Sequence, residues 1–270
     1  MIEAAIDPIL VTIGPLSIRY YGLVYALGFL AAYLFFRYAS RKRLIPFSLD
    51  QTDLMIIYAI VGGVIGGRVG EFLFYQFDTL ISNPLELFMI WHGGMSIHGG
   101  FLGFLLAMWL FCKKYDKELY DITDLAVLPA AASLFFGRIA NFINGELVGR
   151  VTDVSWCVKF VDAPIPSDRI GCRHPSQLYE AIKNAIIFLV LTVRYKAVEF
   201  SERRKGELTW LFILLYGSLR TIATIWRDDQ RWLFGILSTG QVLSIAMVVL
   251  ATFVLLRYYY PRTKNKTKNI

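Results

Sequence analysis

Residues 239–258 read TGQVLSIAMVVLATFVLLRY, and no charged side chain occurs in this stretch before Arg257. A membrane-spanning helix needs about 20 consecutive, mostly apolar residues. The stretch meets that requirement with ordinary helix-forming residues. It therefore predicts a transmembrane helix near the end of the chain.

The rest of the chain has the same character. Of its 270 residues, 56% are hydrophobic and only 18% are charged, and the mean hydropathy is +0.51. This is more apolar material than one soluble core of this size needs. We therefore predict an all-α membrane protein, a single integral membrane domain over residues 1–270 with about seven transmembrane helices. The six further spans are expected at 17–37, 53–75, 93–112, 121–143, 177–194 and 208–226.

The basic residues predict how the helices are oriented. The net charge is +7, but more than half of the 28 basic residues follow alternate spans, which is the positive-inside pattern rather than a nucleic-acid-binding patch. The N-terminus is then outside the cell and the C-terminus is cytoplasmic. The segment 145–175 becomes an outer loop, and 261–270 becomes a basic cytoplasmic tail attracted to anionic membrane lipid.

The cysteines add one expectation about the outer loop. Cys157 and Cys172 both lie there, where an oxidising compartment lets thiols pair, so we predict a disulfide. The alternative is two unlinked thiols. Cys112, at the cytoplasmic end of its span, is expected to be an embedded apolar side chain.

The segment Gly137–Arg150 places charges at the outer end of a hydrophobic stretch. Arg138, Asn141 and Gly145 are spaced i, i+3 and i+7 and share one helical face. A guanidinium beside a carboxamide suits a phosphate or carboxylate, because its planar fork donates two parallel charge-assisted bonds. The alternative is an internal pair between Arg138 and Glu146.

Two other spans contain deeply placed arginines. Arg68 follows a run of paired glycines and precedes Glu71 by three residues, so it either pairs with Glu71 or binds a ligand. Arg220 shares a helical face with Tyr216. Charged groups at membrane depth usually have a partner or a function, and three arginines in different spans favour an anionic ligand.

Glycine pairs flank His98 in the stretch 93–103. Glycine is costly within a helix, so we expect backbone or ligand to approach closely at this point. His98 is either a satisfied core residue or a functional one, and the glycines favour function. The three histidines have no ligand spacing typical of zinc, and we expect no metal and no cofactor.

At this point the sequence resembles the prolipoprotein diacylglyceryl transferase family of bacterial membrane enzymes. Gly137–Arg150 resembles the family signature. The other matching blocks occur in the same order: 68–75, 98–100, 174–180 and 216–220. The resemblance extends over about residues 10–260.

The resemblance implies a reaction. Phosphatidylglycerol gives its diacylglyceryl group to the thiol of the lipobox cysteine in a preprolipoprotein signal peptide, forming a thioether and releasing glycerol phosphate. It also implies the bacterial cytoplasmic (inner) membrane, with the active site facing the outer leaflet. The residues that it implies are catalytic His98, Arg138 and Arg220, and substrate-binding Tyr21, Arg68, Asn141, Glu146, Gly149 and Tyr216.

Individual roles follow from the same comparison. Arg138 and Arg220 are expected to hold the donor phosphate, Glu146 to orient Arg138, and Gly149 to permit a turn at the membrane surface. His98 is the candidate base for the substrate thiol; in a rival mechanism the arginines lower the thiol pKa and His98 only positions groups.

Three features depart from the family pattern. Thr224 stands where an acidic residue is usual, which leaves the orientation of Arg220 open. Phe135 and Phe136 are bulkier than usual, and paired loop cysteines are not typical. Two other functions therefore stay in view: an inactive homologue that binds phosphatidylglycerol, and a transporter or flippase for an anionic solute, although no duplicated halves are visible.

Overall fold

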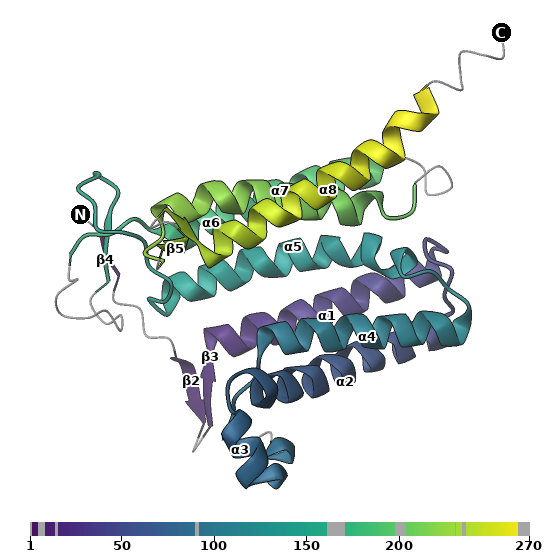
Figure 1. Ribbon diagram of the computed structural model, residues 1–270, viewed down its shortest axis with the longest axis horizontal. Coiled ribbons are helices and arrows are strands. Elements are labelled where there is room, and N and C mark those ends of the chain that lie inside the picture. Colours follow the sequence, from purple (N-terminus) through teal and green to yellow (C-terminus); the bar gives the residue numbers. More distant parts are fainter. Residues whose placement is uncertain are drawn as a thin grey trace. The chain divides into compact units, whose positions relative to one another are not determined.

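The prediction of an all-α membrane protein is confirmed by a computed structural model, which describes residues 2–4, 9–13, 16–89, 92–160, 171–197, 204–229, 231–233 and 236–263. Long helices dominate these residues (Figure 1). They are α1 (Tyr20–Arg41), α2 (Leu49–Phe74), α4 (Ile97–Tyr115), α5 (Tyr120–Ile143), α6 (Ser176–Ala197), α7 (Glu207–Ala223) and α8 (Thr239–Thr263).

Six helical segments of the described residues are long and apolar enough to cross a membrane: Gly22–Arg41, Leu49–Phe74, Tyr120–Ile143, Ser176–Ala197, Glu207–Trp226 and Thr239–Arg257. The helix α4 corresponds to the expected span at 93–112 but falls outside this set. It begins only at Ile97, because Gly93 and Gly94 adopt φ angles of 80° and 78° that are not helical. Ser96 caps it by accepting a hydrogen bond from the Gly99 amide.

Short elements that the sequence did not predict connect the helices. The described residues form three two-stranded sheets: β1 (Ile2–Ala4) with β4 (Val158–Phe160), β2 (Ile9–Ile13) with β3 (Leu16–Arg19), and β5 (Arg231–Leu233) with β6 (Leu237–Ser238). A short helix α3 (Phe77–Ser82) and a 3-10 turn η1 (Pro84–Phe88) follow α2, and a second 3-10 turn, η5 (Thr224–Trp226), extends α7.

The chain divides into two compact units. The first comprises residues 1–32 and 124–270, and the second comprises residues 33–123. The first therefore contains α6, α7, α8 and nearly all of α5, and the second contains α2 and α4. The helix α8 continues to Thr263, so the first residues of the expected tail are helical, and residues 264–270 lie outside the described part.

In the second unit, α2 and α4 lie side by side because glycines line both faces (Figure 1). A Cβ added at Gly66 would lie 2.4 Å from the Gly99 carbonyl oxygen, and one added at Gly103 would lie 2.2 Å from that of Gly62. This is the small-residue packing expected between membrane helices. The close approach predicted around His98 is therefore made by the backbone of a neighbouring helix.

In the first unit, α7 packs between α6 and α8. The start of α7 is fixed by Asp124 of α5, whose carboxylate accepts hydrogen bonds from the Gly206 and Thr209 amides at 2.6 and 2.9 Å. These acceptors satisfy helix N–H groups that have no partner within the helix.

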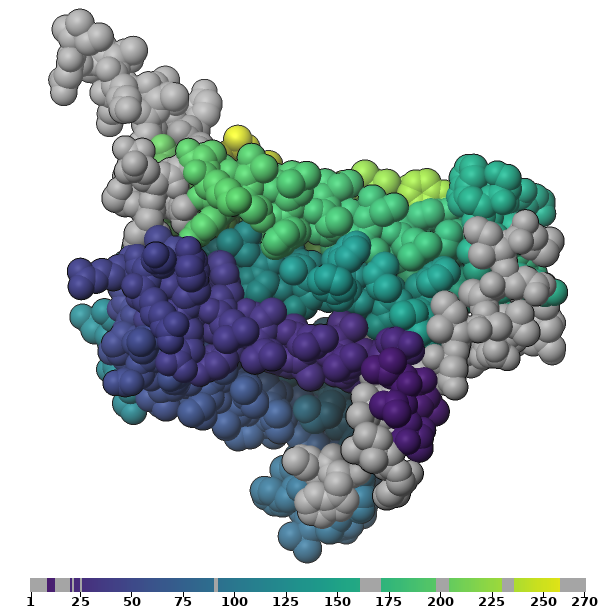
Figure 2. All heavy atoms as spheres, turned by 180° about the vertical axis from the view of Figure 1, so that it is seen from behind, coloured from purple at the N-terminus to yellow at the C-terminus, as the bar shows by residue number. Residues whose placement is uncertain are grey.

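The helix α6 has unlike faces. On the face seen in Figure 2, α6 and α7 form a continuous green surface. The exposed side chains of α6 before its last turn are apolar, and include Ile182, Leu189 and Val193. Its polar side chains near the start of the helix are buried together with Ala181, Ile187 and Leu191; they are Ser176, Gln177, Glu180, Lys183 and Asn184. A membrane helix with its polar groups turned inward indicates a functional interior.

Candidate active site

Glu180 is the centre of an ionic cluster buried in the first unit. Its side chain is only 1% exposed, and three cations from three helices surround it. Oε1 accepts from Arg220 Nη1 at 2.8 Å, and Oε2 accepts from Lys183 Nζ at 2.7 Å. Arg138 Nε lies 3.7 Å from Oε2. The cluster joins α5, α6 and α7 through a single carboxylate.

Helical spacing places these groups. Glu180 and Lys183 are three residues apart on α6 and so share a face. Tyr216 lies one turn before Arg220 on α7 and also contacts the cluster. The Lys183 ammonium lies over its ring, 4.0 Å from the ring centroid. The predicted Tyr216–Arg220 face is therefore part of the cluster, and Tyr216 contacts Lys183.

The charges of the cluster do not balance. One carboxylate faces three cations, which leaves two positive charges in excess. Lys183 is 4% exposed, whereas Arg138 and Arg220 retain 13% and 18% of their side-chain surface. Unpaired cations at membrane depth are costly, so such an excess favours an anionic ligand.

The hydrogen-bond donors of the two arginines are also underused. Among the described residues, Arg220 donates only through Nη1, and Arg138 makes only its long ion pair with Glu180. Arg138 Nη1 and Nη2 and Arg220 Nε and Nη2 therefore have no protein acceptor there. Free, partly exposed guanidinium groups are suited to bidentate recognition of a phosphate.

Arg227 is a fourth cation whose charge interacts with this cluster. It is 8% exposed and pairs with Asp229 at 3.0 Å. Burial lowers its pKa below the ordinary value, Asp229 opposes that shift, and Arg220 and Arg138 lower the pKa further. The two arginines of the cluster therefore act on Arg227 electrostatically, while Asp229 is its ion-pair partner.

The signature segment continues past α5 as a turn held by Glu146. Asn141 Nδ2 and Asn144 Nδ2 each donate to its carboxylate at 3.1 Å. Among the described residues, the acidic partner of Arg138 is Glu180. The expectations that Glu146 pairs with Arg138 or orients it directly are therefore wrong, because Glu146 is held by the two asparagines.

Gly149 serves close packing rather than a turn. Its φ angle is not positive; Gly145 and Leu147 take the left-handed positions, at 65° and 56°. A Cβ at Gly149 would lie 2.4 Å from the His174 carbonyl oxygen and 2.8 Å from that of Trp226. A larger residue would thus separate three chain segments beside the cluster.

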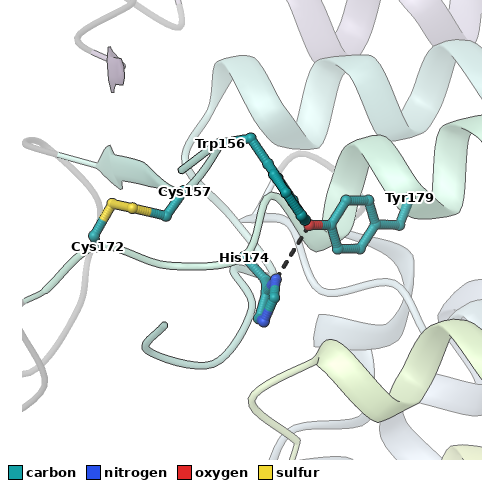
Figure 3. Close-up of a disulfide and its surroundings, with 5 residues drawn as sticks. All are labelled: Trp156, Cys157, Cys172, His174 and Tyr179. Atoms are coloured by element: carbon teal, nitrogen blue, oxygen red, sulfur yellow. Dashed lines mark hydrogen bonds between the residues drawn. A yellow bond between two sulfur atoms is a disulfide. The ribbon is translucent and has the colours of Figure 1, made fainter. Parts of the chain in front are cut away.

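The predicted disulfide between Cys157 and Cys172 is present and braces this loop (Figure 3). Beside it, the Tyr179 hydroxyl accepts from Trp156 Nε1 at 2.8 Å and lies 3.1 Å from His174 Nδ1. An indole N–H can only donate, so the hydroxyl is the acceptor for Trp156, while the tautomer of His174 decides which group donates in the second contact. Tyr179 directly precedes Glu180, so the braced loop positions the start of α6.

These observations can be compared with known proteins. The sequence profile described as prolipoprotein diacylglyceryl transferase matches residues 8–257. The chain is 40% identical over 250 residues to the phosphatidylglycerol–prolipoprotein diacylglyceryl transferase of Oleidesulfovibrio alaskensis, covering 91% of this chain and 90% of that protein. The transferases of the same name from Legionella pneumophila and Coxiella burnetii are 40% and 39% identical, covering 92% and 93% of this chain and 96% and 94% of theirs.

The chain belongs to the prolipoprotein diacylglyceryl transferase family. It is thus a multi-pass membrane protein of a bacterial family of transferases.

Within this family framework, Arg68 differs from the other arginines. It is 4% exposed, and its five N–H groups donate to five backbone carbonyls, those of Glu86, Leu87, Met89, Gly93 and Gly94. Glu71 instead accepts from Gln76 at 3.1 Å. The alternative of an Arg68–Glu71 pair is therefore wrong. The saturated donors favour a structural role for Arg68, which fixes the loop before α4.

His98 and Tyr21 are the two remaining candidates. His98 belongs to the second unit, as the second residue of α4, and its side chain is exposed. Tyr21 is the second residue of α1, and its side chain lies outside the described residues. The roles of both stay predictions.

Sequence reasoning missed three charged members of the site: Glu180, Lys183 and Arg227. Glu180 ended one of the blocks that resembled the family, but it was assigned no role. The available signal was a Glu and a Lys three residues apart inside an apolar stretch, since ionisable residues there are rarely accidental. Arg227 carried no such signal, because it follows the helix in a polar segment.

Proposed function

We propose that the chain transfers the diacylglyceryl group of phosphatidylglycerol to the lipobox cysteine thiol of preprolipoproteins. A thioether forms and glycerol phosphate is released. The observation that carries the proposal is the Glu180 cluster, with two positive charges in excess and unused donors on Arg138 and Arg220. The names of its relatives supply the two substrates.

The cluster suits the leaving group of this reaction. The bond between the glycerol carbon and the phosphate oxygen breaks, its electrons pass to that oxygen, and the carbon forms a bond with the substrate sulfur. Negative charge therefore grows on the phosphate. Arg138 and Arg220 stabilise it from two helices, and removing one such donor typically costs about 10²- to 10³-fold in rate.

Glu180 is a positioning residue for this step. It holds Arg220 and Lys183 by hydrogen bonds and pairs with Arg138. It also accounts for Thr224, which stands where the family usually has an acid. Thr224 is buried, and its hydroxyl donates to the Arg220 carbonyl at 2.7 Å, while Glu180 supplies the carboxylate for the Arg220 side chain. This supports an active enzyme over an inactive lipid-binding homologue.

The substrate thiol must lose its proton to attack. In one mechanism His98 accepts that proton, and in the other the excess positive charge lowers the thiol pKa until thiolate forms without a base. The variant His98→Gln separates them. A large loss of kcat that is relieved at high pH supports the base, whereas near-wild-type turnover assigns the activation to the arginines.

The orientation follows from the distribution of basic residues. The cluster lies near the start of α6, which directly follows the predicted outer loop, so the donor lipid would enter from the outer leaflet of the cytoplasmic membrane. The lipoprotein signal peptide would present its cysteine on the same side.

Purified protein, phosphatidylglycerol and a lipobox peptide test the function. We expect mass spectrometry to find a diacylglyceryl adduct on the peptide cysteine, and Arg138→Gln and Arg220→Gln to reduce its rate about 10²- to 10³-fold. Arg194→Gln is the matched control, because Arg194 pairs with Glu207 at the other end of α6 and should keep its activity. Phosphatidylglycerol binding without any adduct would favour the inactive homologue.

A further inference from the structure

Asn184 is the most anomalous polar residue of α6. Its side chain is 1% exposed, yet neither Nδ2 nor Oδ1 has a hydrogen-bond partner in the described structure. Buried amides are nearly always hydrogen-bonded, and leaving one unsatisfied is costly. No step of the proposed mechanism uses this residue. An unpaired, buried amide in a membrane helix therefore indicates a bound group that supplies the partner.

The position of Asn184 limits what that group is. It lies four residues after Glu180, on the same helical face and about 6 Å further along the helix axis. Because α6 begins at the predicted outer loop, Asn184 lies deeper in the bilayer than the ionic cluster. Lys183, the preceding residue of α6, belongs to that cluster.

A phospholipid in the outer leaflet presents its groups in the same order. The phosphate is nearest the surface, and the two ester carbonyls lie on its hydrocarbon side. An ester carbonyl oxygen only accepts hydrogen bonds. A site for it therefore needs a hydrogen-bond donor that lies deeper in the bilayer than the phosphate site. The Nδ2 group of Asn184 is such a donor.

We propose that Asn184 binds an ester carbonyl of the donor lipid while the Glu180 cluster holds its phosphate. This inference rests on the proposed function and deepens it, because it assigns the residue that recognises the acyl linkage. It makes Asn184 a substrate-binding residue that helps to fix the reacting glycerol carbon between the two contacts.

The experiment compares two donor lipids, ordinary diester phosphatidylglycerol and its diether analogue with matched chains, which lacks ester carbonyls. Transfer to a lipobox peptide is measured for the wild type and for Asn184→Leu, which removes the amide. We expect the wild type to use the diester with a kcat/KM about 3- to 10-fold higher, as one net hydrogen bond allows. In Asn184→Leu the diester should lose that advantage, so the ratio of the two donors should fall to about 1.

Thr192 supplies the matched control. Its hydroxyl is also buried on α6 without a partner, but it lies eight residues beyond Asn184 and about 12 Å deeper. Thr192→Val should therefore keep the wild-type ratio. If Asn184→Leu is not recovered folded, Asn184→Ala is measured in the same way.

The outcomes separate this inference from the function on which it rests. No transfer by the wild type from either lipid would refute the proposed function itself. Transfer with an unchanged donor ratio in both Asn184 variants, or an equal loss for the two lipids, would overturn the ester contact alone and assign the amide to a structural water or to packing.

Discussion

Replacing Glu180 by Gln removes the carboxylate that pairs with Arg138, Lys183 and Arg220, while the side chain keeps nearly the same size. Glu180 is 1% exposed and bonds Arg220 and Lys183 at 2.8 and 2.7 Å. Removing one partner of a buried ion pair typically costs about 3–5 kcal/mol. At about 2–4 °C per kcal/mol, the scale for soluble domains of this size, the apparent Tm should fall by about 6–20 °C. Because Arg138 and Arg220 also lose their common anchor, we expect kcat to fall by about 10²-fold.

The assay is thermal unfolding in a zwitterionic detergent, with and without added phosphatidylglycerol. The lipid phosphate can replace the missing carboxylate, so it should raise the Tm of Glu180→Gln more than that of the wild type. Glu207→Gln is the matched control. Glu207 is buried and pairs with Arg194 away from the cluster, so its loss should lower the Tm without increasing the response to lipid and without lowering kcat.

Two results would refute this reasoning. If Glu180→Gln keeps the wild-type kcat, Glu180 does not position the arginines during transfer. If phosphatidylglycerol stabilises Glu180→Gln and Glu207→Gln equally, the excess charge at the cluster is not what binds the lipid phosphate.

Three further predictions concern parts of the chain around the site. Gly66→Val should prevent folding, because a Cβ there meets the neighbouring helix backbone at 2.4 Å, whereas Gly63→Ala, with its nearest atom at 4.0 Å, should be tolerated; size-exclusion chromatography in detergent compares them. Replacing Cys157 and Cys172 by Ser should cost about 3 kcal/mol for a closed loop of this length, and an unchanged Tm would exclude a stabilising bridge. His174 has a pKa lowered by burial, so its contribution to stability is complete above the unfolded pKa near 6.5 and decreases as the pH falls through the lower folded value. His174→Gln should therefore flatten the dependence of Tm on pH between 5 and 7, and a retained slope would assign it to other groups.

The helices could be predicted from the sequence because hydrophobic length depends only on local composition. The boundaries needed local geometry as well. The span expected from residue 93 begins at Ile97, since Gly93 and Gly94 adopt left-handed conformations whose carbonyls bind Arg68. Short strand pairs such as β2 with β3 carry no periodic signal long enough to detect.

The arginines show why the site could be predicted only in part. Arg68 and Arg138 both follow glycine in an apolar stretch, so their sequence contexts are alike. Arg68 has all its donors bonded to backbone carbonyls, whereas Arg138 has donors without acceptors among the described residues. The partner of Arg138 is Glu180, on a different helix 42 positions later, and no spacing rule connects them. Tertiary packing alone decides which arginine is available to a ligand.

The central claim is that Arg138 and Arg220 hold the phosphate that leaves as the thioether forms. Mass spectrometry of one reaction with phosphatidylglycerol and a lipobox peptide tests it most directly, by quantifying the diacylglyceryl peptide and the released glycerol phosphate together. The account predicts equal amounts of both products from the wild type, and a rate reduced about 10²- to 10³-fold in Arg220→Gln at saturating lipid. No adduct from the wild type, or an unchanged rate in Arg220→Gln, would contradict it.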